Sequence, residues 1–253
     1  MKYLVIATNS LLARVTYKSN EITLLVTKIL QMLVSIWMWM GIYHASGHQS
    51  INGFLLSDMV KYLIITNLLS ILFSTTPIFK LANRIRDGSL NTLLYRPISI
   101  YGENFASYLG SQFLYLVVIL ILSVFTFDFK EGLLLGSYII VSFIMFFTLM
   151  MVLGTLGFWL INMWPLRSGV NACYLVLGGL YFPLSFFGTR IVKVLEFNPF
   201  SLIADVPARM ITGQNTYSIF TYFLANIIWI IVFLGLYKLL LNKGIKKYEG
   251  VGV

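Results

Sequence analysis

Long runs of predominantly apolar residues limit what this chain can fold into. Several of these runs reach the twenty or so residues that an α-helix needs to cross the hydrocarbon core of a bilayer. The residues between and within them are poor in charge: Asp, Glu, Lys and Arg make up 11% of the chain, against about 25% in soluble domains. The sequence therefore predicts an all-α membrane protein whose backbone groups are satisfied inside its helices.

Six segments have the length and apolar character of membrane-spanning helices. They lie at about residues 22–43, 62–79, 105–127, 133–160, 169–187 and 219–241. The fourth segment is long enough to tilt or to contain a break. Once these spans are placed, no room is left for a soluble domain, so residues 1–253 are predicted to form one transmembrane domain.

The basic residues predict the orientation of the spans. Most of the 18 Lys and Arg residues fall in the N-terminal segment, the second loop, the fourth loop and the tail, all on one side. Because Lys and Arg accumulate in cytoplasmic loops, both termini are predicted to be cytoplasmic, which agrees with an even number of spans. The net charge of +9 then reflects these loops and anionic membrane lipid, and no nucleic acid partner is expected.

Two further segments are predicted to be helical. Residues 3–20 mix apolar and basic side chains, which favours an interfacial helix on the cytoplasmic leaflet; a frayed terminus is the alternative. Residues 183–213 are too long for a turn and too apolar for a solvated loop, so short outer-leaflet helices are expected after Pro183 ends the fifth span. Cys173, the single cysteine, is expected to be a buried thiol.

Sequence motifs for catalysis are lacking. The chain contains neither the G-x-x-x-x-G-K-[ST] loop that binds nucleotide phosphates nor H-E-x-x-H, and His44 and His48 have no third ligand nearby, so no catalytic residue and no metal site are predicted. Neither histidine lies in a span, which argues against an intramembrane serine protease. The nine acidic residues lie at span edges or in loops, so a buried proton relay is not expected. Uphill transport would therefore need energy from another protein.

The loop at about residues 80–102 carries the most specific pattern. Asp87-Gly88 predicts a turn, Ser89 can cap a short helix after it, and Pro97 predicts where that helix ends. A short amphipathic helix can fill a groove in another protein; packing against lipid head groups is the alternative. Three leucines form the apolar stripe of this helix at i, i+3 and i+4: Leu90, Leu93 and Leu94.

The same loop resembles a known family. The run IRDGSLNTLLYRP at residues 85–97 is similar to the signature I-x-x-G-x-L-[DN]-x-L-L-x-R-P of a branch of the type-two ABC transporter permeases. Weaker similarities follow in order along the chain: TYKSN at 16–20, GFW at 157–159, PLSFF at 183–187, NPF at 198–200, DVP at 205–207 and KGIKK at 243–247. The family usually has proline after the outer aromatic pair, where this chain has Gly188.

The resemblance implies the membrane subunit of an ATP-driven exporter in a bacterial plasma membrane, and not an enzyme. It implies two permease chains, identical or homologous, each docked on a separate cytoplasmic ATPase that binds the ATP and magnesium; this chain itself would hold no cofactor. The residues expected to dock or shape the contact with the ATPase are Arg84, Arg86, Asp87, Gly88, Leu90, Leu93, Leu94, Arg96 and Pro97.

A substrate path is expected along the first, second and fifth spans. Their aromatic residues favour an amphipathic peptide, lipid or drug, although aromatics that face lipid give the same composition. The residues concerned are Trp37, Trp39, Tyr174, Tyr181 and Phe182. A second hypothesis is a stand-alone membrane immunity or binding protein for a toxic peptide or lipid, which would need no nucleotide-binding partner.

Overall fold

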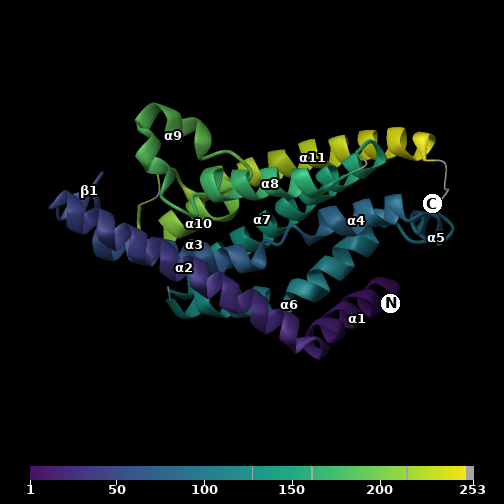
Figure 1. The fold of residues 1–253 in the computed structure, drawn as a ribbon, viewed down its shortest axis with the longest axis horizontal. Coiled ribbons are helices and arrows are strands. Elements are labelled where there is room, and N and C mark those ends of the chain that lie inside the picture. Colours follow the sequence, from purple (N-terminus) through teal and green to yellow (C-terminus); the bar gives the residue numbers. More distant parts are fainter. Residues whose placement is uncertain (127, 161, 215, 249–253) are drawn as a thin grey trace.

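The computed structural model describes residues 1–126, 128–160, 162–214 and 216–248, and it is almost entirely helical (Figure 1). The all-α class is confirmed. In chain order the elements are α1 (Lys2–Thr16), α2 (Lys18–Ser46), β1 (Ser50–Ile51), β2 (Phe54–Leu55), α3 (Leu56–Leu72), α4 (Thr76–Arg86), α5 (Leu90–Leu94), α6 (Ile100–Thr126), α7 (Phe129–Thr155), η1 (Leu156–Phe158), α8 (Trp164–Leu177), η2 (Leu184–Phe187), α9 (Thr189–Leu195), η3 (Ser201–Ile203), α10 (Asp205–Ile211) and α11 (Ile219–Lys247).

Five helical segments of the described chain are long and apolar enough to cross a membrane. They correspond to the first, second, third, fourth and sixth predicted spans, and the second consists of α3 and α4 with a break at residues 73–75. Two positions used in the sequence predictions, Phe127 and Glu249, lie outside the described residues. The five segments are Lys18–Ser46, Leu56–Arg86, Ile100–Phe125, Phe129–Phe158 and Ile219–Lys247.

The fifth predicted span is not one continuous helix. α8 has 14 residues, about 21 Å at 1.5 Å per residue, which is shorter than the roughly 30 Å hydrocarbon core. It ends at a glycine pair: Gly179 has φ +74, and the Leu180 amide donates back to the Leu175 carbonyl at 3.1 Å, as in a Schellman motif. The prediction that Pro183 ends this helix was therefore wrong, because the chain turns several residues earlier.

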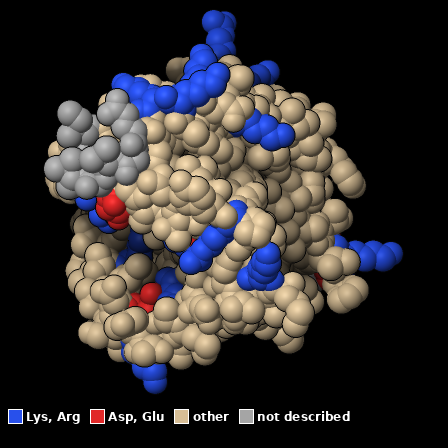
Figure 2. Space-filling view, turned by 90° about the vertical axis from the view of Figure 1, so that its right-hand side faces the viewer, with Lys and Arg blue, Asp and Glu red and all other residues tan. Residues whose placement is uncertain are grey.

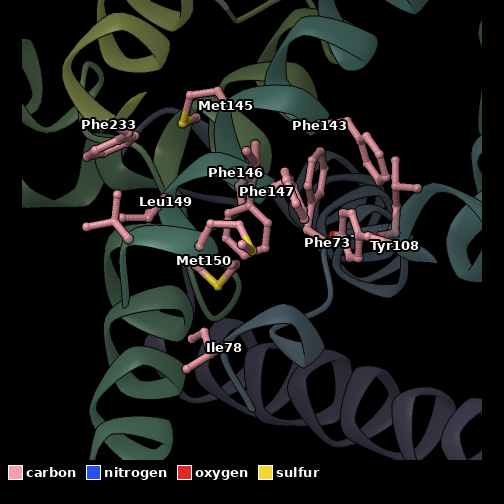
Figure 3. Close-up of a cluster of buried hydrophobic side chains, with 14 of the residues drawn as sticks. Phe73, Ile78, Tyr108, Phe143, Met145, Phe146, Phe147, Leu149, Met150 and Phe233 are labelled. Carbon is pink, nitrogen blue, oxygen red and sulfur yellow. Dashed lines mark hydrogen bonds between the residues drawn. The ribbon is translucent and has the colours of Figure 1, made fainter. Parts of the chain in front are cut away.

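The core of the molecule surrounds α7, which is buried on nearly all sides and packs against α4, α6 and α11. Figure 3 shows its aromatic side chains meeting those of α6 and of the end of α3. Tyr108 stacks on Phe143 with ring centroids 4.7 Å apart, and Phe73 meets Phe146 edge-on at 5.5 Å. The other long helices are therefore packed around one buried central helix.

Helix α1 lies within the N-terminal segment that was predicted to be helical, and it runs beside the start of α6 in the same direction. The two backbones touch at Gly110, where an added Cβ would collide with the Ala7 carbonyl oxygen. Ser10 and Ser107 share a hydrogen bond at 2.9 Å between their hydroxyls. In Figure 1 the start of α1, α5 and the end of α11 lie toward one end of the molecule, and β1 and α9 lie toward the other.

The end that carries β1 and α9 is built from a hairpin and short helices. Asn52 and Gly53 both have positive φ in the two-residue turn between β1 and β2, which the sequence analysis missed although Asn-Gly favours such turns. The short helices predicted for residues 183–213 are confirmed as η2, α9, η3 and α10. Gly188 has φ +86, which proline cannot adopt, so the bend at this position depends on glycine. Cys173 is exposed on α8, contrary to prediction.

Candidate functional site

The turn between α4 and α6 forms a compact structure around α5. Gly88 adopts φ +75, and Asp87 Oδ1 accepts hydrogen bonds from the Ser89 hydroxyl at 2.8 Å and the Ser89 amide at 3.2 Å. The hydroxyl bond is the main cause that lowers the pKa of Asp87 below its ordinary value, so this carboxylate stays charged. Ser89 stands at the N-cap of α5, but its side chain bonds Asp87 instead of capping the helix. The predicted turn and short helix are thus present, with Arg96 and Pro97 directly after its end.

The apolar stripe of α5 divides between the core and the surface. Leu90 and Leu93 are buried in the main core of the chain itself, at 0% and 7% exposure. Leu94 is 42% exposed, and Tyr95 after it is 89% exposed. Leu90 and Leu93 therefore anchor α5 to the bundle, while Leu94 and Tyr95 are available to a partner. The sequence alone did not indicate Tyr95, because its exposure depends on which face of α5 packs against the core.

Arg84 lies in α4, where it holds the turn in place. Its guanidinium forms two hydrogen bonds with the Glu103 carboxylate at the start of α6, one of them at 3.0 Å. Lys80 Nζ lies 3.5 Å from the same carboxylate. These contacts join α4, which precedes α5, to α6, which follows it. Arg84 therefore positions the turn by binding another residue of the same chain.

The surface around α5 is basic. Figure 2 looks onto this end and shows Lys and Arg side chains spread over it with few acidic side chains between them. Four residues on either side of α5 are exposed: Arg86, Asp87, Arg96 and Pro97. Together with Leu94 and Tyr95, they form a surface of apolar, aromatic and charged side chains, which we call the α5 surface. Its composition suits contact with another protein, because aromatic and arginine side chains anchor many interfaces.

A second set of polar contacts fixes the junction between α1 and α2. Arg14 Nε lies 2.7 Å from Glu21 Oε2, and its guanidinium donates to Gln112 Oε1 at 3.1 Å and to the Ser111 carbonyl. Glu21 also accepts from the Tyr115 hydroxyl at 3.0 Å. These bonds fix α1 and the start of α2 against α6.

The five residues predicted for the substrate path fall in separate places. Trp39 is buried and donates from Nε1 to the Tyr181 carbonyl at 2.7 Å, beside half-buried Phe182. Trp37 is 66% exposed on another face of α2. Tyr174 is buried in the main core on α8. The structure therefore brings Trp39, Tyr181 and Phe182 together near η2 but does not form one aromatic wall from all five.

A polar cavity of about 420 Å³ lies between α2, the break that separates α3 from α4, and one face of α8. Two cations reach it, Lys28 from α2 and Arg167 from the first turn of α8. A second cavity of about 390 Å³ leads toward α1 and shares Leu24, Ile71 and Ser74 with the first. The break in α3–α4 and the length of α2 could not be read from hydropathy, so the sequence analysis missed this cavity.

A buried ion network joins the short helices to the long ones. Arg209 donates to Glu196 Oε1 at 2.8 Å and to Asp205 Oδ2 at 2.8 Å, and all three side chains are almost fully buried. Tyr62 of α3 donates to Asp205 at 2.7 Å, and Tyr222 of α11 donates to Glu196 at 2.9 Å. The sequence analysis placed the acidic residues at span edges or in loops and missed the burial of these two. The only signal was the i, i+4 spacing of Asp205 and Arg209.

Two comparisons with known proteins bear on these features. A search of curated proteins finds no match. A search of protein families finds that residues 29–252 match the family described as ABC-2 family transporter protein. The matched region begins in α2 and includes the turn around α5, the ion network and the lining of the polar cavity except Leu24 and Lys28. This chain, with its five long apolar helices, is thus a membrane protein that belongs to the ABC-2 transporter family.

Proposed function

We propose that this chain is the membrane-spanning subunit of an ABC exporter, driven by a separate cytoplasmic ATPase that docks on the α5 surface. The observation that carries the proposal is the division of α5. The side of α5 that carries Leu90 and Leu93 is buried in the core, while Leu94 and Tyr95 are exposed near arginine side chains. A helix fixed on one side and open on the other suits the transfer of force from a partner.

The ion pairs around α5 give this force a route into the membrane domain. Arg84 and Glu103 tie α4 to α6, so a push on α5 would move the end of α4 as a unit with the start of α6. α4 meets α3 at the break at residues 73–75, beside the polar cavity. We infer that this break is the hinge at which docking changes the shape of the cavity.

The proposed topology has six crossings with both termini in the cytoplasm of a bacterial cell. The start of α1 and the end of α11 lie toward the same end as α5 in Figure 1, which supports an even number of crossings. α8 and the turn after it would make the fifth crossing together, since α8 alone is too short. Two such chains, identical or homologous, would pair in the membrane, each with an ATPase below it.

Site-directed crosslinking tests the docking proposal. Cys173 is first replaced by alanine, and a single cysteine is then introduced by Tyr95→Cys on the α5 surface. The matched control is His48→Cys, which is exposed at the opposite end near β1. In native membranes a short bifunctional reagent should join the Tyr95→Cys chain, and not the control, to a protein with a nucleotide-binding P-loop.

The contrary result favours the other hypothesis. If both variants form no crosslink to a nucleotide-binding protein, under conditions in which a known transporter complex is captured, the docking proposal fails. A chain that is recovered alone would then point to a stand-alone binding protein.

A further inference from the structure

We propose that the polar cavity between α2, the α3–α4 break and α8 binds the anionic head group of an amphiphilic molecule. The site is defined by six lining side chains, and the molecule's apolar part would extend along the lipid-facing side of α2. These side chains are Lys28, Ser70, Ser74, Arg167, Asn171 and Tyr174.

The positive charge of the cavity is the first observation that supports binding of an anion. Lys28 lies ten residues inside α2, a helix that is long and apolar enough to cross a membrane, where a lysine is costly unless it reaches water or an anion. Arg167 lines the same cavity. Neither cation forms an ion pair with any described residue, and the described lining contains no acidic side chain. The cavity is therefore positively charged and lacks a counter-charge from the chain itself.

Packing sets the position of the Arg167 side chain. The Arg167 guanidinium carbon lies 5.4 Å from the centroid of the Phe79 ring on α4, a cation–π contact that orients it. Arg167, Asn171 and Tyr174 follow one another at helical spacing, so they share one face of α8. This face presents polar groups to a cavity whose opposite wall contains Lys28.

An unpaired hydroxyl provides an independent observation. Tyr174 is 4% exposed, and its buried hydroxyl oxygen makes no hydrogen bond with any described residue. A buried polar group without a partner is costly, and a ligand in the cavity is a natural partner. The tyrosine hydroxyl can donate to an anionic oxygen, as can Lys28 and Arg167.

Size and surroundings select the class of ligand. A volume of about 420 Å³ suits a phosphate or carboxylate head group with its near neighbours, but it is too small for a whole lipid. Leu24, Ile71 and Trp164 border the cavity, and α2 is largely exposed along its apolar length. The second cavity, which shares Leu24, Ile71 and Ser74, offers a path from the α1–α2 junction. An amphiphile would enter by this path with its head group in the cavity and its tail beside α2.

Native mass spectrometry of the purified full chain in detergent tests the site, with phosphatidylglycerol and phosphatidylcholine of equal chain length as probes. Phosphatidylglycerol should bind about tenfold more tightly, because only it carries net negative charge. The double variant Lys28→Gln, Arg167→Gln should lose this preference. The matched control Lys238→Gln, Arg190→Gln, at exposed positions away from the cavity, should keep it. Equal binding of the two lipids, or an unchanged preference in the double variant, overturns the proposal.

Two further measurements separate the possible roles. Tyr174→Phe removes only the unpaired hydroxyl, so it should weaken phosphatidylglycerol binding several-fold without lowering the melting temperature; unchanged binding removes Tyr174 from the site. Inorganic phosphate at millimolar concentration should fail to displace the lipid, whereas full displacement would assign the site to a soluble anion and overturn the amphiphile.

That the bound molecule is the transported substrate rests on the proposed function. Binding is measured without any ATPase, so the site can fail while docking succeeds, and docking can fail while the site stands. In a complex with the ATPase, phosphatidylglycerol should raise ATP turnover of the wild-type chain and not of the double variant. Stimulation that persists in the double variant would show that this cavity does not hold the transported molecule.

Discussion

Arg209 and Asp205 form a buried ion pair within one turn of α10, with 2.8 Å between Nε and Oδ2. The second carboxylate, Glu196, accepts from the other side of the same guanidinium. Because Tyr62 and Tyr222 bond these acids, α3, α10 and α11 are joined through one cation. The network therefore fixes the short helices that follow α8 against the long helices.

Arg209→Met is expected to destabilise the protein strongly. The change leaves two buried carboxylates without their cation, a loss of roughly 3–5 kcal/mol for a broken buried pair. The melting temperature of the purified chain in detergent should fall by many degrees. Arg190→Met, which removes an exposed arginine from neighbouring α9, should leave it almost unchanged. Equal melting temperatures for both variants would show that the network contributes little.

Gly179→Ala is expected to disrupt the turn that ends α8. Gly179 has φ +74, and an added Cβ would collide with the Tyr62 hydroxyl. Strain of this kind costs about 1–3 kcal/mol. Gly169→Ala, inside α8 and with open space around the glycine, should instead stabilise the helix by about 0.5–1 kcal/mol. The two variants should thus shift the melting temperature in opposite directions, and a shift in the same direction would contradict the observed turn.

The sequence predicted the long helices well because segments of about twenty predominantly apolar residues can form few structures other than membrane-spanning helices. It failed at α8 because Gly178 and Gly179 sit inside an apolar run, where hydropathy is high but the backbone needs a left-handed turn. It identified α5 from local spacing, yet it could not show that Leu90 and Leu93 face the core of the same chain. That choice depends on α4 and α6, which pack around α5 only in the folded state.

The ion network and the cavity were missed for a related reason. Glu196, Asp205 and Arg209 are charged residues near loops, and nothing in their spacing shows that Tyr62 and Tyr222 will cover them. In the sequence Lys28 is a single lysine in the first apolar segment, and nothing in its spacing predicts a cavity. Its role became visible when α8 placed Arg167 and Tyr174 around the same cavity.

Gly110→Ala is expected to separate α1 from α6. The added methyl group would collide with the Ala7 carbonyl, which belongs to a helix backbone and cannot move aside without the whole helix. In a Cys173→Ala background, the pair Ser10→Cys and Ser107→Cys should form a disulfide readily, since the two hydroxyls are 2.9 Å apart. Adding Gly110→Ala should slow this reaction several-fold. The control Gly235→Ala, with open space around the glycine on α11, should not.

Leu94→Asp is expected to abolish substrate-linked ATP turnover while the chain still folds and inserts. Leu94 is 42% exposed, so a charge there remains solvated in the free chain but is buried when a partner covers α5. Leu90→Asp puts the same charge at a fully buried position four residues away, and it should destabilise the chain itself by ~4 kcal/mol or more. Melting temperature and coupled ATP turnover, measured on both variants, separate docking from folding. Leu94→Asp should abolish coupled ATP turnover without changing the melting temperature, whereas Leu90→Asp should abolish turnover and also lower the melting temperature. Normal turnover in a well-folded Leu94→Asp chain would mean that the ATPase does not dock on the exposed side of α5.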